Sequence, residues 1–177
     1  MALRPIRVYP DPVLATPAEP VAAIDQEIRD LVRDMAETMY AAPGVGLAAN
    51  QVGVARRVAV IDPGDPKVHL GLIVLINPEI VEREGEIVWE EGCLSLPGVY
   101  EEVDRAESVA VRALDLDGRE RTIRARGLLA VALQHELDHL DGVLLLDHLS
   151  SLKRGLIKRK LRKEAVERQK EDSSATG

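Results

Sequence analysis

A glutamate between two histidines is the feature of this sequence that most directly suggests chemistry. His135, Glu136 and His139 form the pattern His-Glu-x-x-His. On a helix that turns about 100° per residue, the two histidines lie about 40° apart and can bind one metal ion. Glu136 then lies about 60° from His139, where it could take a proton from a water at that metal. We therefore predict a hydrolytic metal site and not a solvated helix face with incidental histidines.

The only cysteine of the chain, Cys93, is the candidate for a third ligand. It lies in residues 91–95 (EGCLS), just before Pro97 and Gly98, where a turn can present a thiolate toward a cleft. A buried, inert thiol is the ordinary explanation of a lone cysteine. Combined with two histidines, however, one cysteine leaves a fourth position for water, which is typical of a catalytic and not of a structural metal site.

A third segment, residues 44–51 (GVGLAANQ), is rich in small residues. Its glycines would let a ligand approach the backbone closely, and Gln51 offers an uncharged donor for a developing oxyanion. The segment lacks both the Gly-x-Gly-x-x-Gly spacing and the Lys-Ser/Thr ending of a phosphate loop. Nucleotide binding is therefore not predicted.

In this order and at these separations, GVGLAANQ, EGCLS and QHELDH resemble the three signature motifs of the peptide deformylases. The likeness extends from about residue 6 to about residue 163. It implies an α+β fold in which mostly antiparallel sheets surround a central metal-binding helix, with flanking N- and C-terminal helices. It also implies hydrolysis of the N-formyl group from the formyl-methionine of nascent proteins, with release of formate.

The resemblance also implies roles for individual residues. The implied metal ligands are Cys93, His135 and His139. They would hold Fe²⁺ in the cell, although the same ligands bind Zn²⁺ more tightly, and Ni²⁺ or Co²⁺ could substitute. Glu136 would act as the general base and then protonate the departing amine. The Gln51 side chain and the backbone N–H of Leu94 would meet the oxyanion.

Asp138 lies between the two histidines in the sequence but points about 60° to the other side of His135. If the helix is enclosed, this side chain faces the interior, where a carboxylate needs a partner. The family's arrangement favours Arg105 as that partner.

Selection of methionine requires a pocket for an unbranched apolar side chain. Three apolar residues precede His135 on its own helix face: Leu128, Val131 and Ala132. With Val45 they could line such a pocket, although ordinary core packing explains each of the three equally well when it is taken singly. We expect the substrate backbone to pair like an added strand with Val45 and Gly46, and with a sheet edge near Gly98.

Periodicity predicts the elements that must position these residues. A helix is expected after the N-cap Asp25, ending at Pro43, and a second from 127 to 140, ended by Gly142. Strands are expected over 57–77 (two, with a turn at 62–66), 79–81, 86–89, 108–114 and 119–126. Residues 1–170 should form a single domain that includes a basic helix at about 151–170, and residues 171–177 should be a disordered tail.

Composition narrows the class of protein and its partners. Aromatic residues make up 2% of the chain and phenylalanine is absent, which argues against stacking on single-stranded nucleic acid, and no DNA partner is expected. No run approaches the roughly 18 apolar residues of a membrane span, and residues 1–7 do not resemble a signal peptide. The expected location is cytoplasmic, without a membrane partner.

Charge is unevenly distributed along the chain. The net charge is −7, yet residues 153–170 hold nine Lys or Arg against two Glu. A solvated helix face would explain this stretch, but a basic helix on an acidic body also suits docking to a polyanion. Because the C-terminal helices of similar deformylases associate with the ribosome, the resemblance favours a ribosome partner.

Two other functions are compatible with parts of the pattern. A metalloprotease that uses His-Glu-x-x-His needs a third His or Glu ligand downstream; His148 lies there, but in a leucine-rich run without a matching motif. A non-catalytic, metal-containing module could bind the ribosome through the basic helix, but a closed metal site needs a fourth ligand. No second cysteine exists, and neither His69 nor His148 lies in a motif that would supply one.

Overall fold

The chain forms two antiparallel sheets and three helices within the described residues, which are 2–64 and 71–175 of the computed structural model. The predicted α+β fold is confirmed. One sheet has the strand order β1-β2-β3-β6-β7, and β4 and β5 form a separate ribbon. The strands are β1 (Gly46–Ala48), β2 (Val58–Ile61), β3 (Ile73–Glu84), β4 (Ile87–Cys93), β5 (Leu96–Arg105), β6 (Ser108–Leu114) and β7 (Glu120–Arg126). The helices are α1 (Gln26–Ala41), α2 (Gly127–Leu140) and α3 (Ser151–Ala175), with short 3-10 turns η1 (Pro12–Ala15), η2 (Ala49–Val52) and η3 (Leu145–His148).

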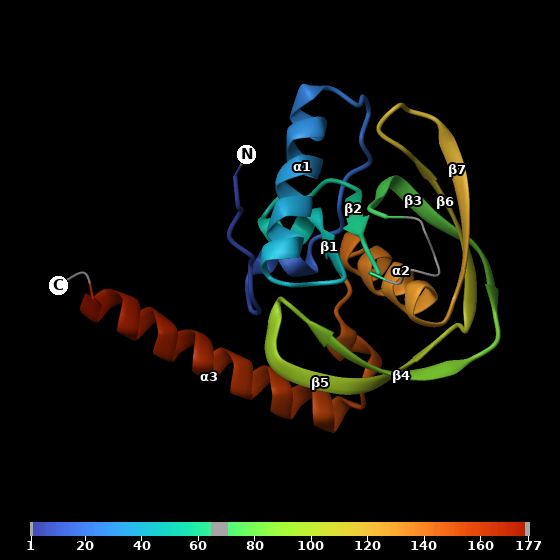
Figure 1. Cartoon of the computed structure of the whole chain (residues 1–177). Helices are drawn as coiled ribbons and strands as arrows, with labels where there is room; N and C mark the ends of the chain where they lie inside the picture. The colour runs from blue at the N-terminus through green and yellow to red at the C-terminus, as the bar shows by residue number, and fades with distance from the viewer. Residues whose placement is uncertain (1, 65–70, 176–177) are drawn as a thin grey trace.

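Helix α2 occupies the middle of the molecule, as predicted (Figure 1). The sheet that contains β3, β6 and β7 curves around one side of it, and the β4–β5 ribbon lies below it in this view. Its apolar residues pack with those of β2, β3 and β6 in one core cluster, to which Leu129, Leu133, Leu137 and Leu140 belong. A central helix enclosed in this way has little contact with water, so polar side chains on it need partners inside the protein.

The ends of α1 and α2 follow from identifiable residues. The Asp25 side chain accepts a hydrogen bond from the Ile28 N–H (3.1 Å) and caps α1, which ends at Ala41 before the proline. Gly142 follows α2 with φ +77°, and a Cβ there would lie 2.7 Å from the Ala15 carbonyl oxygen. Only glycine fits this position, and the predicted end of the helix is confirmed.

Several strand predictions need correction. Residues 79–81 are not a separate strand but part of β3, which continues through an irregularity between Ile76 and Glu79. Asn77 has φ +52° there and its amide pairs with both backbone groups of Val21, which keeps the two halves of the strand aligned. Strands β1 and β5 were not predicted, because β1 has three residues and β5 contains Pro97, Gly98 and several charges. Part of the predicted turn at 62–66, and His69, lie outside the described residues.

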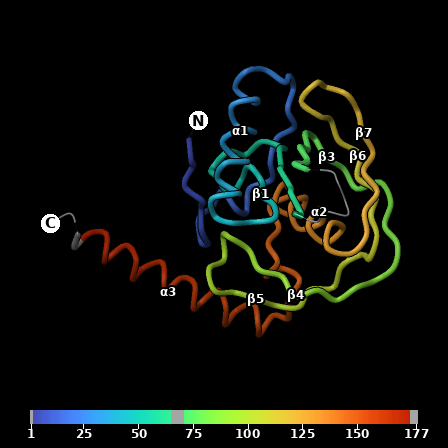
Figure 2. Tube along the Cα trace, viewed as in Figure 1, coloured from blue at the N-terminus to red at the C-terminus, as the bar shows by residue number. Residues whose placement is uncertain are grey.

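Helix α3 runs farther than expected. It continues through Ala175, so the disordered tail predicted to begin at 171 is wrong for residues 171–175, where no glycine or proline interrupts the helix. Its first turns lie against the body, whereas its C-terminal part projects away (Figures 1 and 2). Leu161, only 1% exposed, packs in a cluster with Leu14, Leu96 and Val99. The base of α3 is therefore part of the core that supports the segment after Cys93.

Candidate active site

Three side chains predicted as metal ligands converge in the structure. Cys93 ends β4, and His135 and His139 face it from α2. Cys93 Sγ lies 3.3 Å from His139 Nε2, which lies 3.1 Å from His135 Nε2, and all three donor atoms are within 4.8 Å of one another. Ligand atoms about 2.0–2.3 Å from one metal in tetrahedral geometry are themselves separated by about 3.5 Å. The donor set therefore fits a single metal ion.

A carboxylate fixes the orientation of His135. His135 Nδ1 lies 2.8 Å from Glu91 Oε1, so this nitrogen donates to the carboxylate and Nε2 is left to face Cys93. Arg105 binds both oxygens of Glu91, at 2.7 and 2.9 Å, in a pair that is almost fully buried. Burial alone would raise the pKa of Glu91, but the hydrogen bonds and charges of Arg105 and His135 outweigh it and hold this pKa below its ordinary value.

Sequence reasoning missed this role of Glu91. The signal was present, because Glu91 is two residues before Cys93 and therefore shares its face of β4. Its pairing with Arg105 could not be assigned from spacing, because the register of the ribbon places Ile87, and not Glu91, opposite Arg105. The buried guanidinium reaches Glu91 along the inner face of the ribbon.

The predicted pairing of Asp138 with Arg105 is confirmed. Arg105 Nη1 donates to Asp138 Oδ2 at 2.6 Å, and His148 Nε2 lies 2.8 Å from the same oxygen. Burial opposes ionisation, but the hydrogen bonds from His148 and Arg105 outweigh it and hold the pKa of Asp138 below its ordinary value. His148 thus contacts Asp138 and does not belong to the metal-capable group of Cys93, His135 and His139. As the third ligand of a metalloprotease, His148 would have to lie beside the two histidines of that group.

Replacing Asp138 with alanine should therefore lower the free energy of unfolding. We expect a loss of about 3 kcal/mol, because the change leaves Arg105 buried with one carboxylate in place of two. The matched control is Asp141→Ala: Asp141 pairs with Arg57, but its side chain is 60% exposed, against 26% for Asp138. The control should cost about 0–1 kcal/mol in urea unfolding. Equal losses for the two variants would contradict the structural role given to Asp138.

Glu136 is buried beside the candidate metal ligands. It is 4% exposed, its Oε1 lies 3.9 Å from His135 Nε2, and its Oε2 has no hydrogen-bond partner among the described residues. Burial raises the pKa of Glu136 to about 7. A Cβ added to Gly46 would lie 3.0 Å from the Glu136 side chain, so the glycine at this position makes room for the carboxylate. A carboxyl group in this state can exchange a proton near neutral pH.

The side chain of Gln51 has a fixed orientation. Its Oε1 accepts from the Ala48 N–H at 3.0 Å, which turns the amide nitrogen toward Ser95 Oγ (3.1 Å) and Cys93 Sγ (3.7 Å). Of the two N–H groups, Ser95 takes one and the other points toward the cysteine side of the site. The backbone N–H of Leu94 makes no hydrogen bond to any described residue. The Leu94 N–H thus lacks a partner within the described residues, whereas the Gln51 amide nitrogen is held between Ser95 and Cys93.

A cavity of about 390 Å³ opens onto these groups. The residues predicted for substrate binding all line it: Val45, Gly46, Leu128, Val131 and Ala132. So do Gln51, Leu94, Cys93, His135 and Glu136, while His139 lies buried behind them. Sequence reasoning missed Trp89 and Tyr100 in the cavity wall, although Trp89 is two residues before Glu91 on the same strand face. Gly98 is not among the lining residues.

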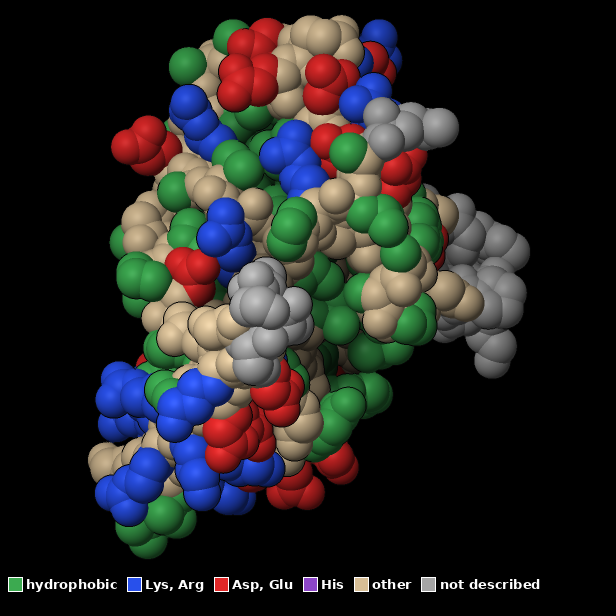
Figure 3. All heavy atoms as spheres, turned by 90° about the vertical axis from the view of Figure 1, so that its left-hand side faces the viewer, with side chains coloured by type: hydrophobic (Ala, Val, Ile, Leu, Met, Phe, Trp, Pro, Cys, Tyr) green, Lys and Arg blue, Asp and Glu red, His purple; other side chains and the backbone are tan. Residues whose placement is uncertain are grey.

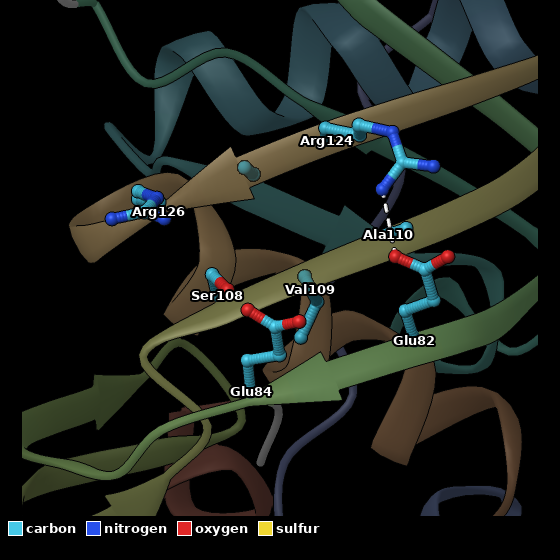
Figure 4. A pocket seen from close by; sticks show the side chains of 8 residues that line it. Glu82, Glu84, Ser108, Val109, Ala110, Arg124 and Arg126 are labelled. Carbon is cyan, nitrogen blue, oxygen red and sulfur yellow. Dashed lines mark hydrogen bonds and ion pairs between the residues drawn. The ribbon is translucent and has the colours of Figure 1, made fainter.

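A second depression lies on the outer face of the large sheet (Figure 4). Its floor is formed by Ser108 and Ala110, and it is crossed by the ion pair between Arg124 and Glu82 (2.7 Å). Glu84 and Arg126 stand on opposite sides of Ser108. Among the described residues, none of those lining it belongs to a metal-capable group. Hydrolytic chemistry is therefore assigned to the cavity beside α2.

The likeness to known proteins agrees with this geometry. A family model described as polypeptide deformylase matches residues 3–155. The chain belongs to the polypeptide deformylase family. A peptide deformylase of Alkalilimnicola ehrlichii is 56% identical over 163 residues, which are 92% of this chain and 91% of the relative. The predicted family is confirmed.

Solved deformylase structures share the fold. The crystal structure of a peptide deformylase from Legionella pneumophila is 50% identical, with a TM-score of 0.86, and covers 95% of this chain and 98% of its own. The peptide deformylase from Thermus thermophilus is 44% identical, with a TM-score of 0.84, and covers 96% and 99%. The predicted arrangement of sheets around the metal-site helix therefore matches experimental structures.

The predicted reaction is confirmed by family membership. This deformylase is a hydrolase that removes the N-formyl group from the formyl-methionine of nascent proteins and releases formate. Neither a metalloprotease nor a non-catalytic ribosome-binding module is favoured by these relatives. Deformylases depend on a metal, with which the group of Cys93, His135 and His139 is consistent. No helix of the described residues has an apolar stretch long enough to cross a membrane.

Proposed function

We propose that Cys93, His135 and His139 hold the catalytic metal of this deformylase and that the metal is Fe²⁺ in the cell. The observation that most supports this set of ligands is the mutual distance of the three donor atoms, which all lie within 4.8 Å of one another. One thiolate and two imidazoles also suit Zn²⁺, Co²⁺ and Ni²⁺, and Zn²⁺ binds such a set more tightly than Fe²⁺. Metal analysis of protein purified without oxygen tests the proposal, with iron as the expected main metal and zinc as the contrary result.

The bound metal would supply Lewis acidity toward water and toward the formyl oxygen. Glu136 would take the proton from the attacking water, whose oxygen then bonds to the formyl carbon. The Gln51 amide and the Leu94 N–H would donate to the oxyanion that develops there. Glu136 would return the proton to the amine nitrogen as the carbon–nitrogen bond breaks, which gives formate and a free methionine N-terminus. A pKa near 7 suits a group that both accepts and returns a proton.

The substrate would enter through the cavity. Its methionine side chain would lie among Val45, Leu128, Val131 and Ala132, which are apolar and line the cavity. Val45 and Leu128 are also exposed to solvent. Its backbone would add to β1 as a further strand, since β1 is an edge strand of the sheet and Gly46 lines the cavity. Main-chain pairing tolerates any sequence after the first residue, as an enzyme of nascent chains requires.

A peptide with one formyl group and two internal peptide bonds separates this function from proteolysis. Incubation of formyl-methionyl-alanyl-seryl peptide with the metal-loaded enzyme should give formate and the otherwise intact peptide, as followed by mass spectrometry. Fragments that keep the formyl group would instead support the metalloprotease alternative. Unchanged peptide would contradict the proposed site as a whole.

We further propose that the enzyme works in the cytoplasm and binds the ribosome through α3. The helix projects from an acidic body, and Lys and Arg side chains gather in the lower part of the face that Figure 3 shows, where α3 lies. Arg159, Lys160 and Lys163 are exposed and make no ion pair with any described residue. Such charges can contact ribosomal phosphates and release bound counterions.

Replacing Arg159, Lys160 and Lys163 with glutamine should weaken ribosome binding without changing the turnover of a formyl-methionyl peptide. The slope of binding against salt, measured by pelleting between about 50 and about 200 mM, should fall by up to about three. Substitution is preferred to truncation after Ser150, which would remove Leu161 from the core and lower stability. Glutamine at the exposed Arg83, Arg119 and Arg126 is the control. If both triple variants bound the ribosome equally well, the basic residues of α3 would form only a solvated helix face and not a ribosome-binding surface.

A further inference from the structure

His148 lies at the outer end of a chain of hydrogen bonds that reaches the metal site. It belongs to η3, which is anchored by the buried Leu145 and Leu146, and its own side chain is 34% exposed. Its Nε2 lies 2.8 Å from Asp138 Oδ2 and 3.4 Å from Arg105 Nη1. The mechanism assigns nothing to this histidine, yet its partners are shared with the buried ion pair behind His135.

The contacts decide which atom of His148 carries the proton. Arg105 can only donate, and its Nη1 already gives a hydrogen bond to Asp138 at 2.6 Å. The Asp138 carboxylate can only accept, so the shorter contact, at 2.8 Å, requires a proton on His148 Nε2. His148 and Arg105 therefore donate to the same oxygen of Asp138, from two sides.

Asp138 and Glu91 share one guanidinium. Arg105 uses Nε and Nη2 for Glu91 and Nη1 for Asp138, so its plane is set by both carboxylates together. Glu91 Oε1 in turn accepts from His135 Nδ1 at 2.8 Å. A donor that holds Asp138 in place therefore also affects the geometry of the hydrogen bonds from Arg105 to Glu91. Through Glu91 it affects the orientation of the His135 ring, and so the direction in which Nε2 points.

We infer that His148 is a positioning residue, which fixes Asp138 and Arg105 and thereby keeps His135 in the orientation that binds metal. The inference rests on the proposed role of His135 as a ligand. Without the His148 donor, Asp138 depends on Arg105 alone, and water can compete for the exposed side of this carboxylate. The ion pair of Arg105 with Glu91 then no longer has a fixed geometry, and the hydrogen bond from His135 Nδ1 to Glu91 orients the His135 ring less firmly.

The test compares His148→Leu, which removes the donor, with His148→Gln, which keeps an N–H donor without the ring. Affinity for Co²⁺ is measured by competition with a chelator, together with kcat, KM and melting temperature. His148→Leu should hold Co²⁺ about tenfold more weakly, the lower end of what partners behind metal ligands contribute. It should also lower kcat while KM stays unchanged, and His148→Gln should restore most of both losses.

A double-mutant cycle shows whether His148 acts through the chain. Glu91→Leu removes the oxygen that accepts from His135 Nδ1 and so breaks the link to His135. Adding His148→Leu to it should therefore cause no further loss of Co²⁺ affinity. The inference would be overturned if the losses of Co²⁺ affinity in the two single variants were fully additive. It would also be overturned if His148→Leu kept the affinity and kcat of the wild type, or if His148→Leu and His148→Gln were equally impaired. If no form of the protein releases formate, the proposed function fails, whereas the Co²⁺ affinities still decide the role of His148.

Discussion

Glu136→Gln is expected to lower kcat/KM for a formyl-methionyl peptide by about 10²- to 10⁴-fold. Glutamine has the same shape, so the fold and the three donor atoms beside it should be unaffected, but it cannot take up a proton. The loss should lie toward the upper limit, because the same carboxyl group is proposed to accept a proton from water and to give it to the leaving amine. Steady-state kinetics with a measured metal content for each preparation checks this.

The control for this variant is Glu90→Gln. Glu90 lines the same cavity but is exposed, and it makes no ion pair with a described residue. Its neutralisation should leave kcat/KM close to that of the wild type. Near-full activity of Glu136→Gln would remove Glu136 from the mechanism. A loss of activity accompanied by a loss of bound metal would assign it to the metal site instead.

The second large effect is expected for Cys93→Ser, on metal binding. A hydroxyl is a poor substitute for a thiolate ligand, and residues that merely support ligands already contribute about 10- to 100-fold in metal affinity. We therefore expect more than about 100-fold weaker binding. Metal retained after dialysis against a chelator measures it, and Fe²⁺-loaded wild-type enzyme should lose activity as Cys93 is oxidised.

Ser95→Ala is the matched control for the cysteine. Ser95 is buried two residues away and accepts a hydrogen bond from Gln51, but it offers no atom to the three-donor group. This variant should retain metal as the wild type does. An unchanged metal content in Cys93→Ser would exclude Cys93 as a ligand, whatever its distance from the histidines.

The parts of the site that sequence predicted are those fixed by local geometry. His135, Glu136 and His139 share one helix, so a constant angle per residue already determines their relation. The start of α1 at Asp25 and the end of α2 at Gly142 likewise depend on a cap and on a left-handed residue, each encoded at one position. Cys93 was placed with them by its motif and by its chemistry, not by any periodicity.

What the sequence did not yield depends on contacts between distant segments. The ion pair of Glu91 with Arg105 requires the β4–β5 register, and β5 itself was hidden by its charges and by Pro97. The length of α3 was underestimated because its C-terminal end is polar and has no apolar face that would indicate a helix. The sequence also does not show that Leu161 packs in a buried cluster with Leu14, Leu96 and Val99. Tertiary packing determines these features, and local propensity does not.

The most direct test of the account is the release of formate by one preparation in three states. Formate and free amine should appear in equal amounts when the wild-type chain carries Fe²⁺ under anaerobic conditions. Both should be lost after removal of the metal with a chelator, and both should return when Fe²⁺ is added back. Formate release at the same rate from the metal-free protein would contradict the proposal that the Cys93, His135 and His139 site is the catalytic centre.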